Sequence, residues 1–393
     1  MVNFNYYTPT KVVFGKNTEE QIGELIKEQK GTKVLIHYGG KSAIESGLLS
    51  RIKDSLNKCN IEFVTLGGVV PNPRLSLVYE GIELVKKENV DFILAVGGGS
   101  VIDSAKAIGY GAAENGDVWE LFDFKRKPMA CLPIGVVLTI AAAGSEMSNS
   151  CVITKEEGLL KRSCAGDVSR PKFAVLNPEL TYTLPSYQTA CGCTDILMHT
   201  MERYFISCDN MEITDSIAEA LMRTVIDASI VLVNDPYDYK ARAEIMWAGS
   251  LSHNGLTGCG INKGDFATHK LEHELGGVYD VAHGAGLAAL WGSWAKYVYK
   301  DCIDRFYKFA TRVMNIAESD DQCAVALKGI EAMENFFRKI NMPTNIKELG
   351  LDLDESALKT LAQKCAIASQ GKTGAAKVLY EEDMLNIYRA ANK

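Results

Sequence analysis

Short, continuous apolar runs alternate with amphipathic stretches before residue 185. The runs lie at residues 33–38, 61–66, 92–96, 135–140 and 173–176. Amphipathic stretches at residues 43–58 and 74–87 lie between some of them. Runs without polar alternation are typical of strands covered on both faces, and strands that alternate with helices build βαβ units. The pattern therefore predicts an α/β domain with a mostly parallel sheet.

The pattern changes after Pro185. Eight of the ten prolines lie at or before this position. Long stretches with helical periodicity follow it, at residues 216–233, 242–256, 324–340 and 355–368. We therefore expect two domains, an α/β domain at residues 1–184 and an all-helical domain at residues 185–393.

Composition narrows the possible functions. The chain has 42 Lys and Arg against 49 Asp and Glu, a net charge of −7, which argues against a nucleic-acid-binding protein. We find no apolar segment long enough for a membrane span and no signal peptide, so we expect a cytoplasmic protein without a membrane partner. The eleven cysteines are odd in number and form no CxxC, which is typical of free thiols in a reducing compartment.

The clearest motif of the first half is FILAVGGGSVIDSAKAIG, residues 92–109. An apolar strand leads into Gly97, Gly98, Gly99 and Ser100, and then into a helix. Glycines let backbone N–H groups approach a ligand closely, and the helix adds the positive end of its dipole. The motif predicts a pyrophosphate site, although it matches neither GxGxxG nor the P-loop. A tight turn without a ligand is the alternative.

A second turn, YGGKSAI at residues 38–44, also follows a predicted strand. Classical NAD sites place an acidic residue at such a strand end, where it binds the ribose hydroxyls. Here Gly39 and Gly40 occupy that position, followed by Lys41 and Ser42. The missing acid removes repulsion against a 2′-phosphate, which favours NADP over NAD; an ordinary turn with an exposed lysine is the alternative.

Two segments of the second half carry residues that bind metals. Asp195 and His199 are four residues apart, as are His269 and His273, so each pair shares a face of a helix. His283 follows shortly after. One aspartate with three histidines suits a borderline divalent ion such as Fe²⁺ or Zn²⁺. We assign no ligand role to His37 or His253.

The same residues allow another interpretation. His269, Glu272 and His273 match HxxEH, the inverted zinc-peptidase motif. In such an enzyme both histidines bind zinc and the glutamate is the general base. This interpretation leaves the glycine turn unexplained, whereas a dehydrogenase uses both features.

Taken together, the motifs resemble those of the iron-containing, group III alcohol dehydrogenases of the dehydroquinate synthase-like superfamily. The resemblance extends over essentially the whole chain and includes GGGSVIDSAKAIG, AAAGSEMSNS, NPELTYTLP and the ordered Asp-x3-His, His-x3-His and His-Gly elements. WELF and the YGGKS turn resemble the butanol dehydrogenase or aldehyde reductase branch. Two departures stand out: Ala143 replaces a threonine of the coenzyme loop, and Asn177 replaces an aspartate before proline.

The resemblance implies roles for individual residues. The metal ligands would be Asp195, His199, His269 and His283, in a cleft between the two domains, with His273 near the substrate but off the metal. The coenzyme-binding residues would be Gly39, Gly40, Ser42, Gly98, Gly99, Ser100, Asp103, Thr139 and Lys161. It also implies a cytoplasmic homodimer.

We therefore expect a metal-dependent, NAD(P)H-linked alcohol dehydrogenase or aldehyde reductase that acts on a small, butanol-like primary alcohol or its aldehyde. The metal would be Fe²⁺, with Zn²⁺ possible, and NADP would be preferred to NAD. The alternatives are another superfamily member, such as a glycerol dehydrogenase or a dehydroquinate synthase-like lyase, a non-catalytic cofactor-binding protein, and the HxxEH peptidase.

Overall fold

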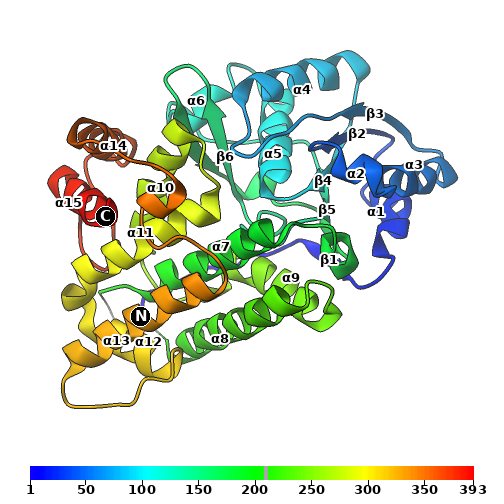
Figure 1. Ribbon diagram of the computed structural model, residues 1–393. Coiled ribbons are helices and arrows are strands. Elements are labelled where there is room, and N and C mark those ends of the chain that lie inside the picture. The colour runs from blue at the N-terminus through cyan, green and yellow to red at the C-terminus, as the bar shows by residue number, and fades with distance from the viewer. Residues whose placement is uncertain (208–210) are drawn as a thin grey trace. The chain divides into compact units, whose positions relative to one another are not determined.

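The computed structural model describes residues 1–207 and 211–393, which form two compact units (Figure 1). One unit is Thr8–Thr183, and the other is Leu184–Lys393 together with Met1–Tyr7. The first seven residues were expected in the α/β domain. Instead, the backbone N–H of Val2 donates to the carbonyl of Gly260 at 2.9 Å, which holds the N-terminal segment on the helical unit.

The α/β unit is organised around a parallel sheet. Within the described residues the sheet has six strands in the order β1-β8-β5-β4-β2-β3, and every neighbouring pair is parallel. The strands are β1 Lys11–Phe14, β2 Lys33–Tyr38, β3 Glu62–Leu66, β4 Phe92–Gly97, β5 Ile134–Leu138 and β8 Phe173–Leu176. Strands β4, β5 and β8 are buried at every position, which is the physical reason for their continuous apolar sequence.

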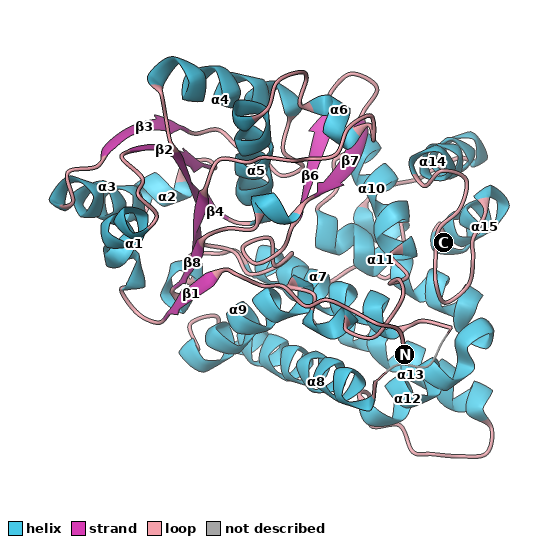
Figure 2. Ribbon diagram, turned by 180° about the vertical axis from the view of Figure 1, so that it is seen from behind, coloured by secondary structure: helices cyan, strands magenta, loops and turns pink. Residues whose placement is uncertain are grey.

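Helices cover both faces of this sheet (Figure 2). The helices of this unit are α1 Ile22–Glu28, α2 Ser42–Glu45, α3 Leu48–Lys58, α4 Leu75–Glu88, α5 Gly99–Ala113 and α6 Trp119–Phe122. Val34 and Ile36 of β2 form a core with apolar residues of α1 and α3. His37 points to the opposite face, where it contacts Ser104 of α5. The helix expected over residues 43–58 is interrupted at Gly47, which adopts the left-handed conformation at φ 73°.

A two-stranded antiparallel sheet of β6 (Ser150–Lys155) and β7 (Leu160–Ala165) was not expected from the sequence. Its strands are only partly buried and carry charged residues, so they lack the continuous apolar run that marked the parallel strands. After β8, the side chain of Asn177 accepts a hydrogen bond from the N–H of Glu179, so the residue that replaces aspartate there still caps a short helix.

Helices dominate the second unit, as predicted. They are α7 Ser186–Tyr204, α8 Glu212–Asn234, α9 Tyr239–His253, α10 Ala267–Tyr279, α11 His283–Val298, α12 Ile303–Arg312, α13 Gln322–Lys339, α14 Glu355–Ala368 and α15 Glu381–Ala391. Trp291 and Trp294 of α11 are fully buried and pack against Phe309 and Phe306 of α12. None of the described helices is long and apolar enough to cross a bilayer.

His37 is a buried, uncharged histidine of β2. Its Nδ1 lies 2.9 Å from the carbonyl oxygen of Leu66, and its Nε2 lies 2.8 Å from Oγ of Ser104. A carbonyl only accepts, so Nδ1 carries the proton and Nε2 accepts from the serine hydroxyl. Burial lowers the pKa of His37 to about 4. This role in the core fits the expectation that His37 is not a ligand.

Because the pKa of His37 is lower in the folded than in the unfolded chain, its contribution to stability is present above pH 6.5 and is lost as the pH falls towards 4. A shift of this size corresponds to a loss of about 3 kcal/mol over this range. In His37→Asn, where the amide can donate to Leu66, this pH dependence should disappear. Urea unfolding of both proteins between pH 7 and 4.5 measures the difference, and parallel curves would contradict the prediction.

Candidate active site

The glycine turn joins β4 to α5, as the sequence predicted. Gly98 is the N-cap of α5, and a Cβ at this position would lie 2.9 Å from Cβ of Ile140. A Cβ at Gly97 would lie 2.4 Å from Cγ2 of Val101, so both positions require glycine. Within the described residues no side chain caps this helix. Its first N–H groups and its positive dipole end are therefore directed at any anion bound there.

Other predicted coenzyme residues follow the ends of the neighbouring strands. Gly39, Gly40 and Ser42 come just after β2, and Thr139 comes just after β5; both strands pair with β4. The N–H of Thr139 donates to the carbonyl of Gly97 at 3.1 Å. Open α/β sheets bind ligands at the carboxyl ends of their strands. The topology therefore places these residues along the edge where a coenzyme would be expected.

Asp103 and Lys161 have different surroundings. One carboxylate oxygen of Asp103 accepts from Oγ of Ser145 at 2.6 Å, and the other accepts from the N–H of Val152 at 2.8 Å. These bonds give Asp103 a structural role within the domain. Lys161 is buried in β7, opposite Thr154 of β6. That Asp103 or Lys161 contacts the coenzyme directly remains a prediction.

Three of the predicted metal ligands converge on one oxygen atom of the fourth, Asp195. Oδ1 of Asp195 lies 3.2 Å from Nε2 of His199, 3.5 Å from Nε2 of His269 and 3.7 Å from Nε2 of His283. Asp195 and His199 lie on α7, His269 lies in the first turn of α10, and His283 begins α11. Three helices that are separate in the sequence thus contribute to one compact group.

This group fits a divalent cation. Ligand atoms held ~2.1 Å from a tetrahedral ion lie about 3.4 Å from one another, close to the three separations from Asp195. Oδ1 of Asp195 and Nε2 of His269 are buried and have no hydrogen-bond partner within the described residues. Buried polar atoms normally have partners, so these two atoms indicate a bound group. Three imidazole nitrogens and one carboxylate oxygen suit Fe²⁺ or Zn²⁺.

The glycine after His283 explains how α11 reaches the site. A Cβ on Gly284 would lie 2.1 Å from the carbonyl oxygen of Cys191 in α7. Only glycine allows the two helices to pack this closely, and the packing brings His283 to Asp195. The His-Gly element noted in the sequence therefore has a steric cause.

Comparisons with known proteins identify the family of this chain. The sequence pattern of the iron-containing alcohol dehydrogenases matches residues 9–178, and that of the family's C-terminal region matches residues 189–392. The chain is 39% identical to NADH-dependent butanol dehydrogenase A of Clostridium acetobutylicum, over 99% of both proteins. The chain belongs to the iron-containing alcohol dehydrogenase family.

Further relatives of this alcohol dehydrogenase agree with the assignment. The chain is 37% identical to the NADPH-dependent aldehyde reductase YqhD of Escherichia coli, over 90% of each protein. The crystal structure of NADH-dependent butanol dehydrogenase A from Thermotoga maritima superposes with a TM-score of 0.96 at 38% identity, covering 100% of this chain and 99% of that one. The resemblance stated from the motifs is confirmed, and the enzyme class is that of an NAD(P)-dependent oxidoreductase of alcohols and aldehydes.

Two buried glutamates of this alcohol dehydrogenase orient the histidines. Oε2 of Glu202 contacts Nδ1 of His269, and its Oε1 accepts the backbone N–H of the same residue at 3.1 Å. Oε2 of Glu272 contacts Nδ1 of His283. An ionised carboxylate only accepts, so each Nδ1 carries a proton and each Nε2 is the ring nitrogen that faces Asp195.

Sequence reasoning missed Glu202, although a signal was present. Asp195, His199 and Glu202 occupy positions i, i+4 and i+7 of α7, one continuous helix face. Glu272 was considered only as the base of an HxxEH peptidase. Its contact with His283, together with the family membership, excludes that interpretation. His253, to which no role was assigned, packs against His199 with ring centroids 4.0 Å apart.

His273 lies beside the four-residue group. Its ring centroid is 6.2 Å from that of His269 and 5.8 Å from that of His283. Nitrogen or oxygen atoms of His273, His283 and Glu272 also lie within 4.8 Å of one another. Spacing alone could not separate His269 from His273. Of these two residues, within the part of the chain that the structure describes, only His269 lies within 4 Å of Oδ1 of Asp195.

The electrostatics of the group favour a cation. Burial would raise the pKa of Asp195, but the histidines around it hold the pKa well below its usual range. Burial lowers the pKa of His199 to about 4, so its ring stays neutral, as a ligand must be. Burial would also lower the pKa of His269, but Glu202 and Asp195 raise it to about 9. These carboxylates make the surroundings of His269 attractive to positive charge.

Glu202→Gln should weaken metal binding ~10–100-fold, because the amide no longer fixes the proton and orientation of the His269 ring. The rate of metal loss to a chelator, followed by elemental analysis, measures this effect. Glu334→Gln is the matched control, since this buried glutamate binds Lys296 instead. Equal rates of metal loss in the two variants would contradict a role for Glu202 behind the metal.

Proposed function

We propose that this protein is a metal-dependent alcohol dehydrogenase that interconverts a small, butanol-like primary alcohol and its aldehyde with NADP(H), working mainly as an aldehyde reductase. The observation that carries the proposal is the group of three imidazole nitrogens around one buried oxygen of Asp195. The family's relatives include both butanol dehydrogenases and an aldehyde reductase, which supports the substrate class.

Asp195, His199, His269 and His283 would hold one divalent ion, which we propose to be Fe²⁺, with Zn²⁺ as the alternative that the same ligands suit. When bound, the metal supplies a Lewis acid that polarises the carbonyl oxygen and stabilises an alkoxide. The chain's own contribution is to hold the Nδ1 protons of two of these histidines, so that their Nε2 atoms face the ion. Glu202 and Glu272 do this for His269 and His283, because each accepts the Nδ1 proton.

The coenzyme would bind along the edge formed by Gly39, Gly40 and Ser42, the turn Gly98–Gly99–Ser100, and Thr139, with Asp103 and Lys161 nearby. Its nicotinamide supplies the hydride. Backbone N–H groups at the start of α5 would bind the pyrophosphate. Gly39 and Gly40 carry no acid that would repel a 2′-phosphate, and Lys41 is exposed beside them, which supports a preference for NADPH.

His273 would relay the proton or orient the substrate. It lies close to two of the proposed ligands yet outside the group around Asp195. An imidazole at this place can donate a proton to the alkoxide oxygen during aldehyde reduction and accept it back during alcohol oxidation.

Initial rates with butyraldehyde, glyoxals and dihydroxyacetone test the substrate class. Each is measured with NADH and NADPH after loading the protein with Fe²⁺ or Zn²⁺. Highest kcat/KM on butyraldehyde supports the proposal, whereas highest kcat/KM on dihydroxyacetone favours the glycerol dehydrogenase alternative. We further propose a cytoplasmic homodimer, which light scattering of the purified protein and cell fractionation would test.

His269→Ala should lose the metal, because an incomplete ligand set holds it weakly. His273→Ala should keep metal and coenzyme but lose ~10²–10⁴-fold in kcat with an altered pH profile, because only proton relay or orientation is removed. Elemental analysis and pH–rate profiles of the two proteins check this. A metal-free His273→Ala beside a loaded His269→Ala would reverse the assignment, and unchanged turnover in His273→Ala would remove the catalytic role.

Gly39→Asp should shift the ratio of kcat/KM towards NADH, because a carboxylate repels the 2′-phosphate. A new Cβ at this position has room, since its nearest atom is the carbonyl oxygen of Val69 at 3.4 Å. Gly39→Asn is the neutral control of equal size. A strong wild-type preference for NADH would show that the missing acid does not control coenzyme choice.

A further inference from the structure

We propose that Lys106, buried in α5, is a positioning residue that fixes the loop of residues 139–150 against the glycine turn and thereby sets coenzyme affinity. The inference rests on the proposed coenzyme function of that turn. It assigns a role to a side chain that does not itself belong to the turn.

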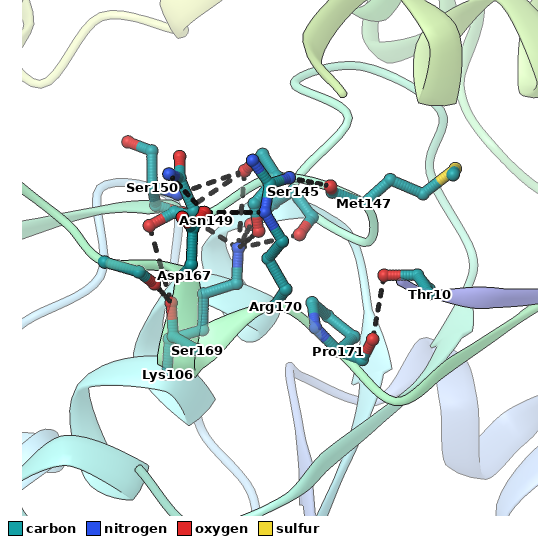
Figure 3. A network of polar contacts seen from close by, with 12 residues as sticks. Thr10, Lys106, Ser145, Met147, Asn149, Ser150, Asp167, Ser169, Arg170 and Pro171 are labelled. Atoms are coloured by element: carbon teal, nitrogen blue, oxygen red, sulfur yellow. Dashed lines mark hydrogen bonds and ion pairs between the residues drawn. The ribbon is translucent and has the colours of Figure 1, made fainter. Parts of the chain in front are cut away.

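The ammonium group of Lys106 is enclosed by backbone carbonyls (Figure 3). Nζ donates to the carbonyl oxygens of Ser145 at 2.7 Å, Ser150 at 2.8 Å and Ser148 at 3.0 Å, and it lies 2.9 Å from Oγ of Ser145. The side chain is 0% exposed. A lysine ammonium has three N–H groups, so three carbonyls of one loop account for its donors.

Asp103 holds the same loop from one helical turn earlier. Its carboxylate accepts from Oγ of Ser145, which therefore contacts both the cation and the anion of α5. Burial lowers the pKa of Lys106, and the charge of Asp103 opposes this shift. A buried ammonium is costly unless its donors are satisfied, so the carbonyls and the lysine depend on each other.

The other half of the loop lies against the glycine turn. The N–H of Thr139 donates to Gly97, Ile140 occupies the space beside Gly98, and Ala143 would contact a Cβ on Gly99 at 3.4 Å. Lys106 lies seven residues after Gly99 on the same helix, about two turns along it. One helix therefore presents its N-terminus to the coenzyme and anchors the loop that packs beside that N-terminus.

Two further carbonyls of the loop are also held by donors outside it. Arg170 donates from Nη1 to the carbonyl of Met147 at 2.7 Å (Figure 3). The N–H of Gly166 donates to the carbonyl of Asn149 at 2.9 Å. Much of the loop's shape is thus fixed by donors outside it. Without the ammonium, the buried carbonyls of Ser145 and Ser148 lose this donor, and the backbone must rearrange to reach others.

The test is equilibrium binding of NADH and NADPH to the intact protein, measured by fluorescence, together with kcat, KM and metal content. Lys106→Met removes the charge and keeps most of the side-chain volume. Ser145→Ala is a milder second variant that removes only the hydroxyl shared by Lys106 and Asp103. Ser104→Ala is the matched control, because it removes a buried polar contact from the same helix on the side of His37.

We expect Lys106→Met to raise the coenzyme Kd and KM on the order of 10- to 100-fold. Ser145→Ala should raise them less, and Ser104→Ala should leave them within about twofold, near the limit of such measurements. Metal content and kcat at saturating coenzyme should stay close to wild type in all three. A merely structural role would instead lower the active fraction, and hence the apparent kcat, without changing the coenzyme Kd.

Wild-type protein that binds neither coenzyme would contradict the proposed function itself. Wild-type protein that binds a coenzyme, beside variants whose Kd is unchanged, would overturn only the role of Lys106. If circular dichroism shows that Lys106→Met does not fold, the Ser145→Ala result decides: an unchanged Kd overturns the inference, and a raised Kd supports it.

Discussion

A buried carboxylate surrounded by imidazole nitrogens is the interaction on which the helical unit depends. Asp195 is 2% exposed, and its Oδ1 faces Nε2 atoms from three different helices. Such an oxygen is expensive to bury unless a cation or a proton compensates it. The packing of α7, α10 and α11 therefore serves a charge as well as a hydrophobic core. Gly284 makes that packing possible, because any side chain there would collide with α7.

Buried charged side chains also position the residues of both candidate sites without belonging to either site. Glu202 and Glu272 have no exposed surface and contact the far nitrogens of two histidines, so they fix which nitrogen is free to bind a metal. Lys106 plays a corresponding part in the α/β unit, where it orders carbonyls rather than histidines. In each case a side chain outside the site determines the geometry of the groups that would bind the metal or the coenzyme.

The parallel sheet imposes the second constraint. All six strands run the same way, so the turns after β2, β4 and β5 lie along one edge. At this edge Gly97 and Gly98 leave space for Val101 and Ile140, and the start of α5 remains uncapped by any described side chain. The glycines are thus explained first by packing within the protein. The close approach of a phosphate to the backbone is the functional consequence that we propose.

The sequence by itself determined the class of each unit and most of the residues of interest. Strands β2 and β8 began and ended where their apolar runs did, and α14 spans the predicted residues, because continuous burial and a 3.6-residue period leave direct marks on the choice of side chains. The four-residue spacings likewise identified the helix faces of α7 and α10. Such periodic patterns describe only residues that lie close together in the sequence. The β6–β7 hairpin was not predicted because its half-buried, charged strands lack a continuous apolar pattern.

Only the tertiary structure decided which groups meet. It distinguished His269 from His273, assigned Glu272 to His283, and placed Glu202 behind His269, because these contacts join residues of different helices. It also revealed the carbonyls around Lys106, some forty residues further along the chain. Local periodicity records which face of an element is buried. The partner that this face meets depends on how distant segments pack, and that information is spread over the whole chain.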